Sequence, residues 1–271
     1  MVEDLSWAPP GVDASRASAA RVYDYWLGGT HNFQADRDAA RALIAVEPNA
    51  RGFARQNRAF LVRAVRFMAR AGVRQFLDIG SGIPTQSNVH QVARSVAPAA
   101  RVVYVDCDPV AVAHSRAILG TDPGSAVIQA DLRDPTSILS DAAARRLLNP
   151  AEPTGLMLGA VLHFLSDAED PWQIVATLRD ALAPGSYLAL SHASGDGRAD
   201  GDAEVREKAY NSRVANNATL RCRAAIERFF EGFELLDPGV VFPPLWRPDS
   251  PDDVPEEPGA FWALAGVGRR T

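Results

Sequence analysis

Two short segments of the sequence place acidic and glycine residues where a nucleoside could bind. Asp78 precedes a turn that contains Gly80, Ser81 and Gly82, and Asp106 ends the next apolar run. Two glycines allow the backbone to turn sharply and to lie close to a ligand. A carboxylate in the position of Asp106 can accept hydrogen bonds from both hydroxyl groups of a ribose. This pattern indicates a nucleoside-binding site.

The elements expected to position these residues form a strand, a helix and a second strand. Gln75–Ile79 and Arg101–Val105 are short apolar runs typical of buried strands, and apolar residues recur at helical spacing between Ser87 and Val96. In a parallel sheet, a ligand binds outside the carboxyl ends of the strands, where a glycine loop admits it. The pattern therefore predicts that the glycine turn and Asp106 meet at one edge of a sheet.

Two residues of this motif argue against a dinucleotide as the ligand. Thr85 stands where a dinucleotide-binding motif has its third glycine. The negative charge of Asp78, directly before the loop, would repel a pyrophosphate. A cationic ligand suits the loop better, and a nicotinamide oxidoreductase is disfavoured.

Three segments look like the successive cofactor motifs of class I S-adenosylmethionine-dependent methyltransferases: Phe76–Gly82, Val103–Pro109 and Gln129–Pro135. A narrower resemblance lies in Arg21–Gly29, with Asn32, Phe33 and Asp36 after it. This segment is similar to the N-terminal signature of an actinobacterial family of S-adenosyl methyltransferases, formerly catalogued as a domain of unknown function. The resemblance extends from about Ser15 to Val267.

The resemblance implies an α/β fold, a Rossmann-like, doubly wound, mostly parallel seven-stranded sheet with an N-terminal helical cap. It also implies S-adenosyl-L-methionine as the cofactor. In this family reading, Asp131 accepts a hydrogen bond from the exocyclic amine of adenine and the Leu132 N–H faces a ring nitrogen, whereas a turn residue is the alternative for Asp131. The motif Val103–Pro109 makes Cys107 a cofactor-binding candidate, and Asp108 is expected to cap the next helix.

The methionine end of this cofactor carries a carboxylate that needs a cation or several N–H donors. Arg58 is the candidate. The alternative is that Gln56, Asn57 and Arg58 form the solvated first turn of a helix over Phe53–Ala71.

We expect three regions along the chain: a flexible tail over residues 1–14, a helical cap over 15–72 and the Rossmann-like core over 73–271. Ser15 or Ser18 can cap the first helix, which is predicted to run to Leu27, where Gly28 and Gly29 end it. Further helices are predicted over the ranges 36–46, 53–71, 109–119, 171–182, 203–216 and 220–231. Further strands are predicted over 124–130, 154–161, 186–192, 234–242 and 260–267. The polar, glycine-rich range 193–202 reads as a solvated linker.

The residues that would meet the substrate are less well marked. Tyr23, His31 and Asn32 are candidates for a lid over the methionine end of the cofactor, although the aromatic residues could simply pack a helix on the sheet. Trp246 lies in a long proline-rich connection that could line the pocket. His163, at the end of a strand, could be a general base or a hydrogen-bonded wall residue.

Composition limits the other possibilities. The chain of 271 residues has a formal net charge of -5, which gives no support to a nucleic-acid partner. Its two cysteines and its histidines lack metal-ligand spacing, so no metal is expected. Neither a signal peptide nor a membrane-spanning stretch is recognisable. The expectation is therefore a cytoplasmic protein without a membrane partner.

Two functions remain open from the sequence. The first is an S-adenosylmethionine-dependent methyltransferase that acts on a small-molecule O or N nucleophile, since the segment at His163 lacks the Asn/Asp-Pro-Pro-aromatic signature of enzymes that methylate exocyclic or amide nitrogens. The second is a sensor or scaffold that binds S-adenosylmethionine or S-adenosylhomocysteine without turnover. The methyl acceptor and the oligomeric state are not specified by any motif.

Overall fold

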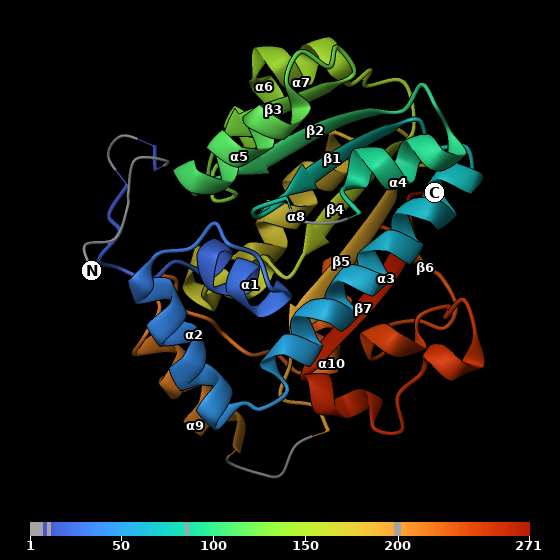
Figure 1. Ribbon diagram of the computed structural model, residues 1–271. Coiled ribbons are helices and arrows are strands. Elements are labelled where there is room, and N and C mark those ends of the chain that lie inside the picture. The colour runs from blue at the N-terminus through green and yellow to red at the C-terminus, as the bar shows by residue number, and fades with distance from the viewer. Residues whose placement is uncertain (1–7, 10–11, 85–86, 198–201) are drawn as a thin grey trace.

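The computed structural model describes residues 8–9, 12–84, 87–197 and 202–271, and within them a seven-stranded sheet has the order β3-β2-β1-β4-β5-β7-β6. Strands β1 to β5 pair in parallel, and β7 is antiparallel to β5 and β6. The expected fold class is confirmed (Figure 1). The strand bounds are β1 Gln75–Ile79, β2 Arg101–Asp106, β3 Ser125–Gln129, β4 Thr154–Gly159, β5 Tyr187–Ala193, β6 Glu234–Leu235 and β7 Ala263–Arg269.

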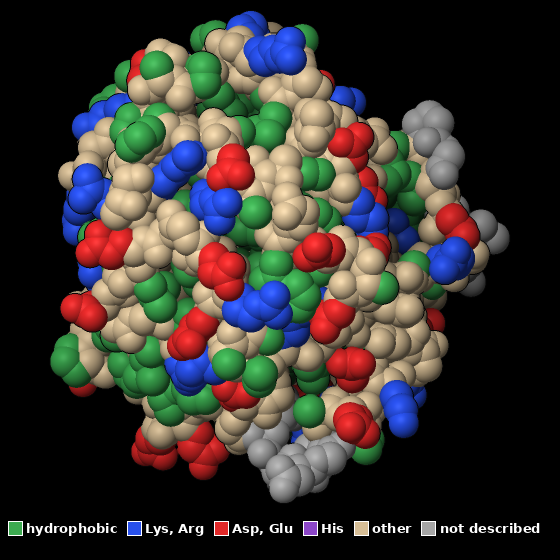
Figure 2. All heavy atoms as spheres, turned by 180° about the vertical axis from the view of Figure 1, so that it is seen from behind, with side chains coloured by type: hydrophobic (Ala, Val, Ile, Leu, Met, Phe, Trp, Pro, Cys, Tyr) green, Lys and Arg blue, Asp and Glu red, His purple; other side chains and the backbone are tan. Residues whose placement is uncertain are grey.

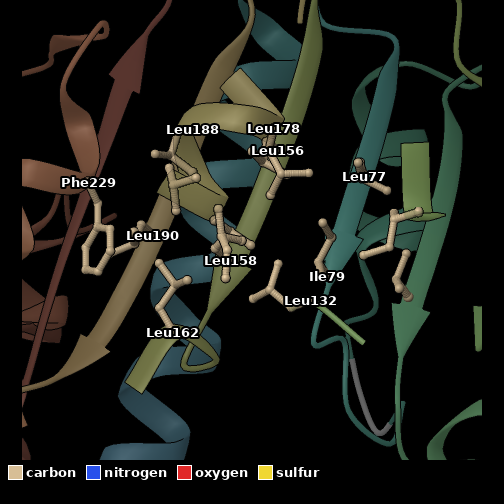
Figure 3. Packing of buried hydrophobic residues seen from close by; sticks show 14 of the residues in the cluster. Leu77, Ile79, Leu132, Leu156, Leu158, Leu162, Leu178, Leu188, Leu190 and Phe229 are labelled. Atoms are coloured by element: carbon tan, nitrogen blue, oxygen red, sulfur yellow. The ribbon is translucent and has the colours of Figure 1, made fainter. Parts of the chain in front are cut away.

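Both faces of the central strands are buried, which explains why they read as continuous apolar runs. On one face, Leu77, Leu156 and Leu188 belong to a cluster that also holds Ile79 and Phe229 (Figure 3). On the opposite face, alternate residues of the same strands pack with the long helix that precedes β1; they include Phe76, Met157 and Ala189. The two clusters fix the register, because a shift by one residue would exchange the faces.

Helices cover both faces of this sheet (Figure 1). Those on the side of Phe76 are α3 Ala50–Arg70, α4 Val89–Val96 and α5 Pro109–Leu119. Those on the side of Leu77 are α6 Pro135–Ser140, α7 Ala142–Leu147, α8 Pro171–Asp180 and α10 Arg223–Glu227. Near the carboxyl ends of the parallel strands lie α1 Ala19–Leu27, α2 Gln34–Val46 and α9 Asp202–Asn211 (Figure 1). Single turns of 3-10 helix are η1 Leu162–Phe164, η2 Asp167–Glu169, η3 Arg228–Phe230, η4 Pro243–Leu245, η5 Pro251–Asp253 and η6 Pro258–Phe261.

The first helix begins and ends as its sequence predicts. The Ser18 side chain accepts a hydrogen bond from Arg21 N, and Gly28 takes a left-handed conformation with φ 86°. Gly29 has a different role, because a Cβ atom there would lie 1.9 Å from Asp24 Oδ1. That carboxylate is buried and accepts hydrogen bonds from His31 N at 3.0 Å and Asn32 Nδ2 at 2.8 Å. The two glycines thus hold the turn after α1 around one carboxylate.

Gly29→Ala is expected to destabilise the protein by about 1–3 kcal/mol, the usual cost of overpacking, since the held Asp24 carboxylate cannot move aside freely. Denaturant unfolding measures this. Gly28→Asn is the control, because nothing lies within 4 Å of its Cβ position and Asn tolerates the left-handed region. Equal stability of the two variants would contradict the packing explanation.

Several boundaries differ from the predicted ones for local reasons. Helix α3 begins at Ala50 rather than Phe53, so Asn57 falls beyond the first turn. Asn57 is 2% exposed, so the alternative prediction of a solvated first turn is wrong for this residue. Strand β4 ends at Gly159 instead of Val161, because Ala160 has φ 53°. In the range 234–242 only β6 and a single bridge at Val241 pair with β7, since Pro238 has no N–H and Gly239 turns the chain at φ 85°.

The region between β5 and β6 also departs from expectation. Helix α9 ends at Asn211 rather than residue 216, because the Asn211 side chain bonds Ala218 N and O and folds the next segment into a turn. The second helix, expected over 220–231, starts at Arg223. The supposed linker 193–202 is not solvated where it begins, because Ser194 is 0% exposed and donates to Arg221 O at 2.7 Å.

Residues 198–201 of that linker, Thr85, and residues 1–7 and 10–11 of the expected tail lie outside the described residues. Among the residues that are described, no helix has the length and apolar character needed to span a membrane.

Candidate active site

A cavity of about 330 Å³ lies at the carboxyl ends of the parallel strands, beside the pair β1 and β4 where the strand order reverses direction. Open α/β sheets bind their ligands at such a switch point. Every cofactor candidate from the sequence lines this cavity: Arg58, Asp78, Gly80, Ser81, Gly82, Asp106, Cys107, Asp131 and Leu132. The strand ends thus bring together residues that are far apart in the sequence.

The glycine loop after β1 is tied to β2 and is open toward the cavity. Gly80 N and Ser81 N donate to Val105 O at 2.8 Å and 3.2 Å. A Cβ atom on Gly80, which has φ 71°, would lie 2.3 Å from Val161 Cγ2. Gly82 also has positive φ, 67°, but nothing lies within 4 Å of its Cβ position. Packing against Val161 therefore requires glycine at position 80, whereas Gly82 leaves an open cradle beside its backbone.

Asp106 connects this loop to the end of β2. Its Oδ2 accepts from Gly82 N at 2.7 Å and its Oδ1 from Asp108 N at 2.8 Å. The side chain is 8% exposed, and burial raises the pKa of its carboxyl to about 6 despite these two hydrogen bonds. Since a carboxylate offers about four lone-pair sites, Asp106 retains acceptor capacity for ligand hydroxyls.

Asp78 and Arg58 line the same cavity. Burial raises the pKa of Asp78 to about 7, while the charge of Arg58 acts in the opposite direction. Within the described part of the chain, Arg58 Nε is buried without a hydrogen-bond partner, and so is Ser81 Oγ. Unsatisfied buried polar atoms are uncommon in native proteins, so these two atoms point to a polar ligand.

Asp108 does more than the capping predicted for it. Its Oδ1 accepts from Val110 N at 2.8 Å, as an N-cap of α5 should. Its Oδ2 accepts from Ser18 Oγ at 2.6 Å and from Arg21 Nη1 at 3.2 Å, and Arg21 also pairs with the fully buried Asp36 at 2.8 Å. This buried ion network fastens α1 and α2 to the strand end that carries Asp106.

The residues after β3 combine two roles. Asp131 is exposed, its side chain pairs with that of Arg133, and the Arg133 backbone N donates to Asp131 Oδ1 at 2.9 Å. The alternative prediction, a turn residue, therefore describes part of the environment of Asp131. Leu132 is 6% exposed and packs on the core. The pKa of the Cys107 thiol is raised to about 11 by burial and by the charge of Asp106, which keeps this thiol protonated.

Of the four substrate candidates, Tyr23 lines the cavity. Its hydroxyl donates to Ala54 O at 3.0 Å and accepts from Asn57 Nδ2 at 2.9 Å, and Asn57 Oδ1 in turn accepts from Ser191 Oγ at 2.5 Å. This chain of hydrogen bonds holds the cap against the sheet.

The other three candidates are not brought to the cavity wall. Asn32 is buried and bonds Asp24, and the His31 ring packs against His114 with centroids 3.7 Å apart. Trp246 is 0% exposed and packs edge-on against Phe60 on the inner face of α3. The proline-rich connection therefore closes the core behind the sheet rather than the site.

His163 lines the cavity beside a buried histidine and arginine that the sequence did not reveal. His163 Nδ1 accepts from Ala193 N at 3.4 Å, and its ring lies 5.6 Å from that of His192. Arg221 donates to His192 Nε2 at 2.9 Å and to Leu165 O at 2.7 Å. Burial lowers the pKa of His163 well below 6.5, and the charges of His192 and Arg221 act in the same direction.

Arg221 fixes the backbone around His163 through Leu162 O and Leu165 O, and it pairs with Asp167 at 2.6 Å. No local pattern marks an arginine between two helices as the anchor of a distant strand end. Its role follows from the fold alone.

These features fit a nucleoside that carries a cationic centre and a carboxylate. The Gly82 cradle and the Asp106 carboxylate suit a ribose, Asp78 suits a positive charge, and Arg58 suits a carboxylate. Among the described residues, no cluster of three or more His, Cys, Asp or Glu side chains could hold a metal ion. Fold and site together define an S-adenosylmethionine-binding protein of the class I methyltransferase type.

The chain belongs to the S-adenosyl methyltransferase family, whose model matches residues 5–271. The cofactor of this family is S-adenosylmethionine. A crystallised candidate methyltransferase from Thermobifida fusca is 45% identical, with TM-score 0.91 and coverage of 98% of this chain and 99% of that one. A DUF574 family protein from Streptomyces avermitilis is 38% identical, with TM-score 0.90 over 96% and 99% of the two chains.

More distant structures share the fold. An O-methyltransferase family protein from Burkholderia thailandensis, 13% identical, has TM-score 0.53 and is matched over 92% of this chain and 64% of that chain. No curated protein sequence matches the chain.

Proposed function

We propose that this protein transfers the methyl group of S-adenosylmethionine to an O or N nucleophile of a small molecule. The observation that carries the proposal is the shape of the cavity, which continues from the Asp106 loop into an apolar region lined by α1, α3 and α9. A binding protein without turnover would need no space beyond its cofactor. The continuation therefore favours catalysis over the sensor or scaffold alternative.

In this proposal, the cofactor candidates divide the work along the nucleoside. Asp106 accepts from the ribose hydroxyls beside Gly82, and Cys107 packs against the sugar as a neutral thiol. Asp131 and Leu132 contact the adenine, and Arg58 with Ser81 contacts the methionine end. Asp78 lies near the sulfonium, where an ionised carboxylate is favoured by the cation.

S-adenosylmethionine supplies an electrophilic methyl group, and its transfer breaks a carbon–sulfur bond, forms a carbon–oxygen or carbon–nitrogen bond and leaves S-adenosylhomocysteine. The protein contributes mainly alignment and exclusion of water. A proton released by the acceptor passes to solvent.

We propose that His163 orients the acceptor rather than removing its proton. Its Nδ1 lone pair already faces the Ala193 N–H, so the neutral ring carries its proton on Nε2. With a pKa well below 6.5, the ring is a weak base at neutral pH. A donor role is consistent with both observations.

In this proposal the helices α1 and α2 of the region 15–72 act as a cap over the core 73–271, while α3 packs on the face of the sheet itself. Helix α1 supplies Tyr23 to the cavity wall, and the network of Arg21, Asp36 and Asp108 ties the cap to β2. Closure by this cap would exclude water during methyl transfer.

The proposal names a small molecule, and neither nucleic acid nor membrane, as the partner. On the face seen in Figure 2, basic and acidic side chains are interspersed, so that face presents no continuous basic surface for phosphates. We place the protein in the cytoplasm, where its two free thiols would stay reduced.

The test is calorimetry with the purified chain, followed by a screen for release of S-adenosylhomocysteine across metabolite pools. We expect binding of S-adenosylmethionine and S-adenosylhomocysteine, no measurable binding of NAD, and turnover with at least one pool. Tight NAD binding would overturn the cofactor assignment. Cofactor binding with no turnover in any pool would favour the sensor.

A further inference from the structure

The part of the cavity beyond the cofactor candidates is walled by aromatic side chains. Six of them line it, and they come from five separate places in the chain: Tyr23 and Trp26 on α1, Phe53 on α3, Phe164 in η1, Tyr210 on α9 and Trp262 before β7. Tyr23 and Trp26 are one helical turn apart, so both point to one side of α1. None of the six belongs to the cofactor motifs.

Two of these rings are stacked face to face. Phe53 and Trp262 stack with centroids 4.0 Å apart and an angle of 6° between their planes. Tyr23 meets Phe53 edge-on at 6.4 Å, and Trp26 meets Trp262 edge-on at 6.5 Å. Because the Tyr23 hydroxyl already bonds Ala54 O and Asn57, this residue offers the cavity its ring rather than its polar group.

A second pair of rings stands beside His163. Phe164 and Tyr210 lie with centroids 6.3 Å apart and planes inclined by 28°. The His163 ring is 4.2 Å from that of Phe164. This pair comes from η1 and α9, whereas Tyr23, Trp26 and Phe53 come from the region 15–72, so the aromatic lining draws on both the cap region and the core.

A group of aromatic side chains can bind a neutral aromatic molecule or an alkylammonium ion. The carboxylates near these rings help to distinguish the two kinds of ligand. Glu47 forms an ion pair with Arg206, and Glu207 accepts from Leu220 N at 2.8 Å. Arg206 therefore already neutralises Glu47, and an alkylammonium ligand would have to displace it from that carboxylate, whereas a neutral ligand leaves the ion pair in place. Glu207 keeps acceptor capacity that the hydroxyl group of a neutral ligand can use.

We propose that this aromatic half of the cavity binds a neutral, planar aromatic molecule whose hydroxyl group accepts the methyl group. This inference rests on the proposed methyltransferase function and gives its substrate class. Aromatic walls favour an aromatic ligand, since offset and edge-on ring contacts add to the burial of apolar area. The phenol oxygen forms the new bond to the methyl carbon, the carbon–sulfur electron pair stays on sulfur, and the phenol proton goes to water.

The experiment measures binding of three probes to the protein saturated with S-adenosylhomocysteine. The probes are 2-naphthol, its saturated analogue decahydro-2-naphthol, and choline. We expect 2-naphthol to bind about tenfold or more tightly than the saturated alcohol, and choline to give no measurable binding. Equal binding of the two alcohols, or tighter binding of choline, would overturn the proposal.

Variants locate the effect. Phe53→Leu and Tyr210→Leu, from opposite parts of the lining, should each weaken 2-naphthol about fivefold to tenfold while the affinity for S-adenosylhomocysteine changes less than about twofold. Phe67→Leu is the matched control, because Phe67 packs against Tyr187 and Trp246 outside the cavity and should leave naphthol binding unchanged. Tyr210 is only half-buried, so its variant serves if Phe53→Leu does not fold.

The cofactor titration separates two kinds of failure. If the wild-type chain binds S-adenosylhomocysteine but the Leu variants bind 2-naphthol like wild type, only the substrate class is wrong. If the wild-type chain binds no S-adenosylhomocysteine, the proposed function fails and the substrate class fails with it.

Discussion

Asp106→Ala is expected to weaken binding of S-adenosylhomocysteine about a hundredfold or more. A hydrogen bond to a charged acceptor contributes about 1.5–3 kcal/mol, and two ribose hydroxyls would lose such a bond, which corresponds to at least that factor. The loss should exceed that of any other single cofactor candidate, because Asp106 also holds Gly82 N at 2.7 Å and so shapes the glycine loop. Calorimetry measures the affinity, and denaturant unfolding shows that the variant is folded.

Asp106→Asn and Asp108→Ala are the controls for this variant. The amide keeps one acceptor oxygen and the shape, so its affinity should fall between those of wild type and Asp106→Ala. Asp108→Ala removes the cap of α5 and the partner of Ser18, and should act more on stability than on affinity. A folded Asp106→Ala protein that binds as tightly as wild type would refute the ribose assignment.

The pKa of Asp106 adds a pH dependence with a defined sign. The folded-state pKa is raised from 3.8 to about 6 by burial, so the folded protein holds this proton where the unfolded chain has lost it. Ionisation of Asp106 therefore lowers the free energy of unfolding as the pH rises toward 6, and the loss is complete above pH 6. The same ionised carboxylate is the form that accepts hydrogen bonds from the ribose, so cofactor binding is favoured at that pH. Affinity should rise between about pH 5 and pH 7 in wild type and rise less in Asp106→Asn, where Asp78, with a pKa raised to about 7, is left to titrate.

Arg21→Met is expected to destabilise the protein by about 3–5 kcal/mol, which is the usual cost of removing one partner of a buried ion pair. Arg21 is 5% exposed, Asp36 is 0% exposed and Asp108 is 9% exposed, so both carboxylates would lose their cation without gaining water. Denaturant unfolding measures the loss. Cofactor affinity should fall as well, because the cap is no longer fastened to the strand end that bears Asp106.

Arg41→Met on α2 is the matched control for this variant. The Arg41–Asp38 pair has side chains 56% and 61% exposed, so breaking it should cost about 1 kcal/mol or less. A similar loss for both arginine variants would mean that burial of the Arg21 network carries no special weight. An unchanged cofactor affinity in a folded Arg21→Met protein would show that fastening the cap to the end of β2 does not contribute to cofactor binding.

The motif around Gly80 and Asp106 could be predicted because its chemistry is local. A short apolar strand, two glycines and a terminal acid need no distant partner to define a turn at a strand end, so β1, α4 and β2 were found close to their true bounds. The cap at Asp108 was found for the same reason, since an N-cap is a contact between residues a few positions apart, and the structure selects Ser18 from the two predicted candidates, Ser15 and Ser18.

The tertiary structure decided what distant residues do to each other. Asn57 reads as a solvated helix residue until Tyr23 and Ser191 come within hydrogen-bonding distance of it, across separations that no periodicity encodes. Trp246 is in a proline-rich loop typical of a pocket wall, yet it is fully buried and packs edge-on against Phe60 of α3.

The sequence by itself determined most of the cofactor candidates, since these residues lie at or directly after the ends of β1, β2 and β3. Only the tertiary structure decided the aromatic part of the cavity. Its walls come from α1, α3, η1, α9 and the residue before β7. Rings such as Phe53 and Trp262 stack at 4.0 Å only when α3 packs against β7 and the turn before it. Contacts between elements distant in sequence depend on the packing of the whole core, so they cannot be predicted from any single segment.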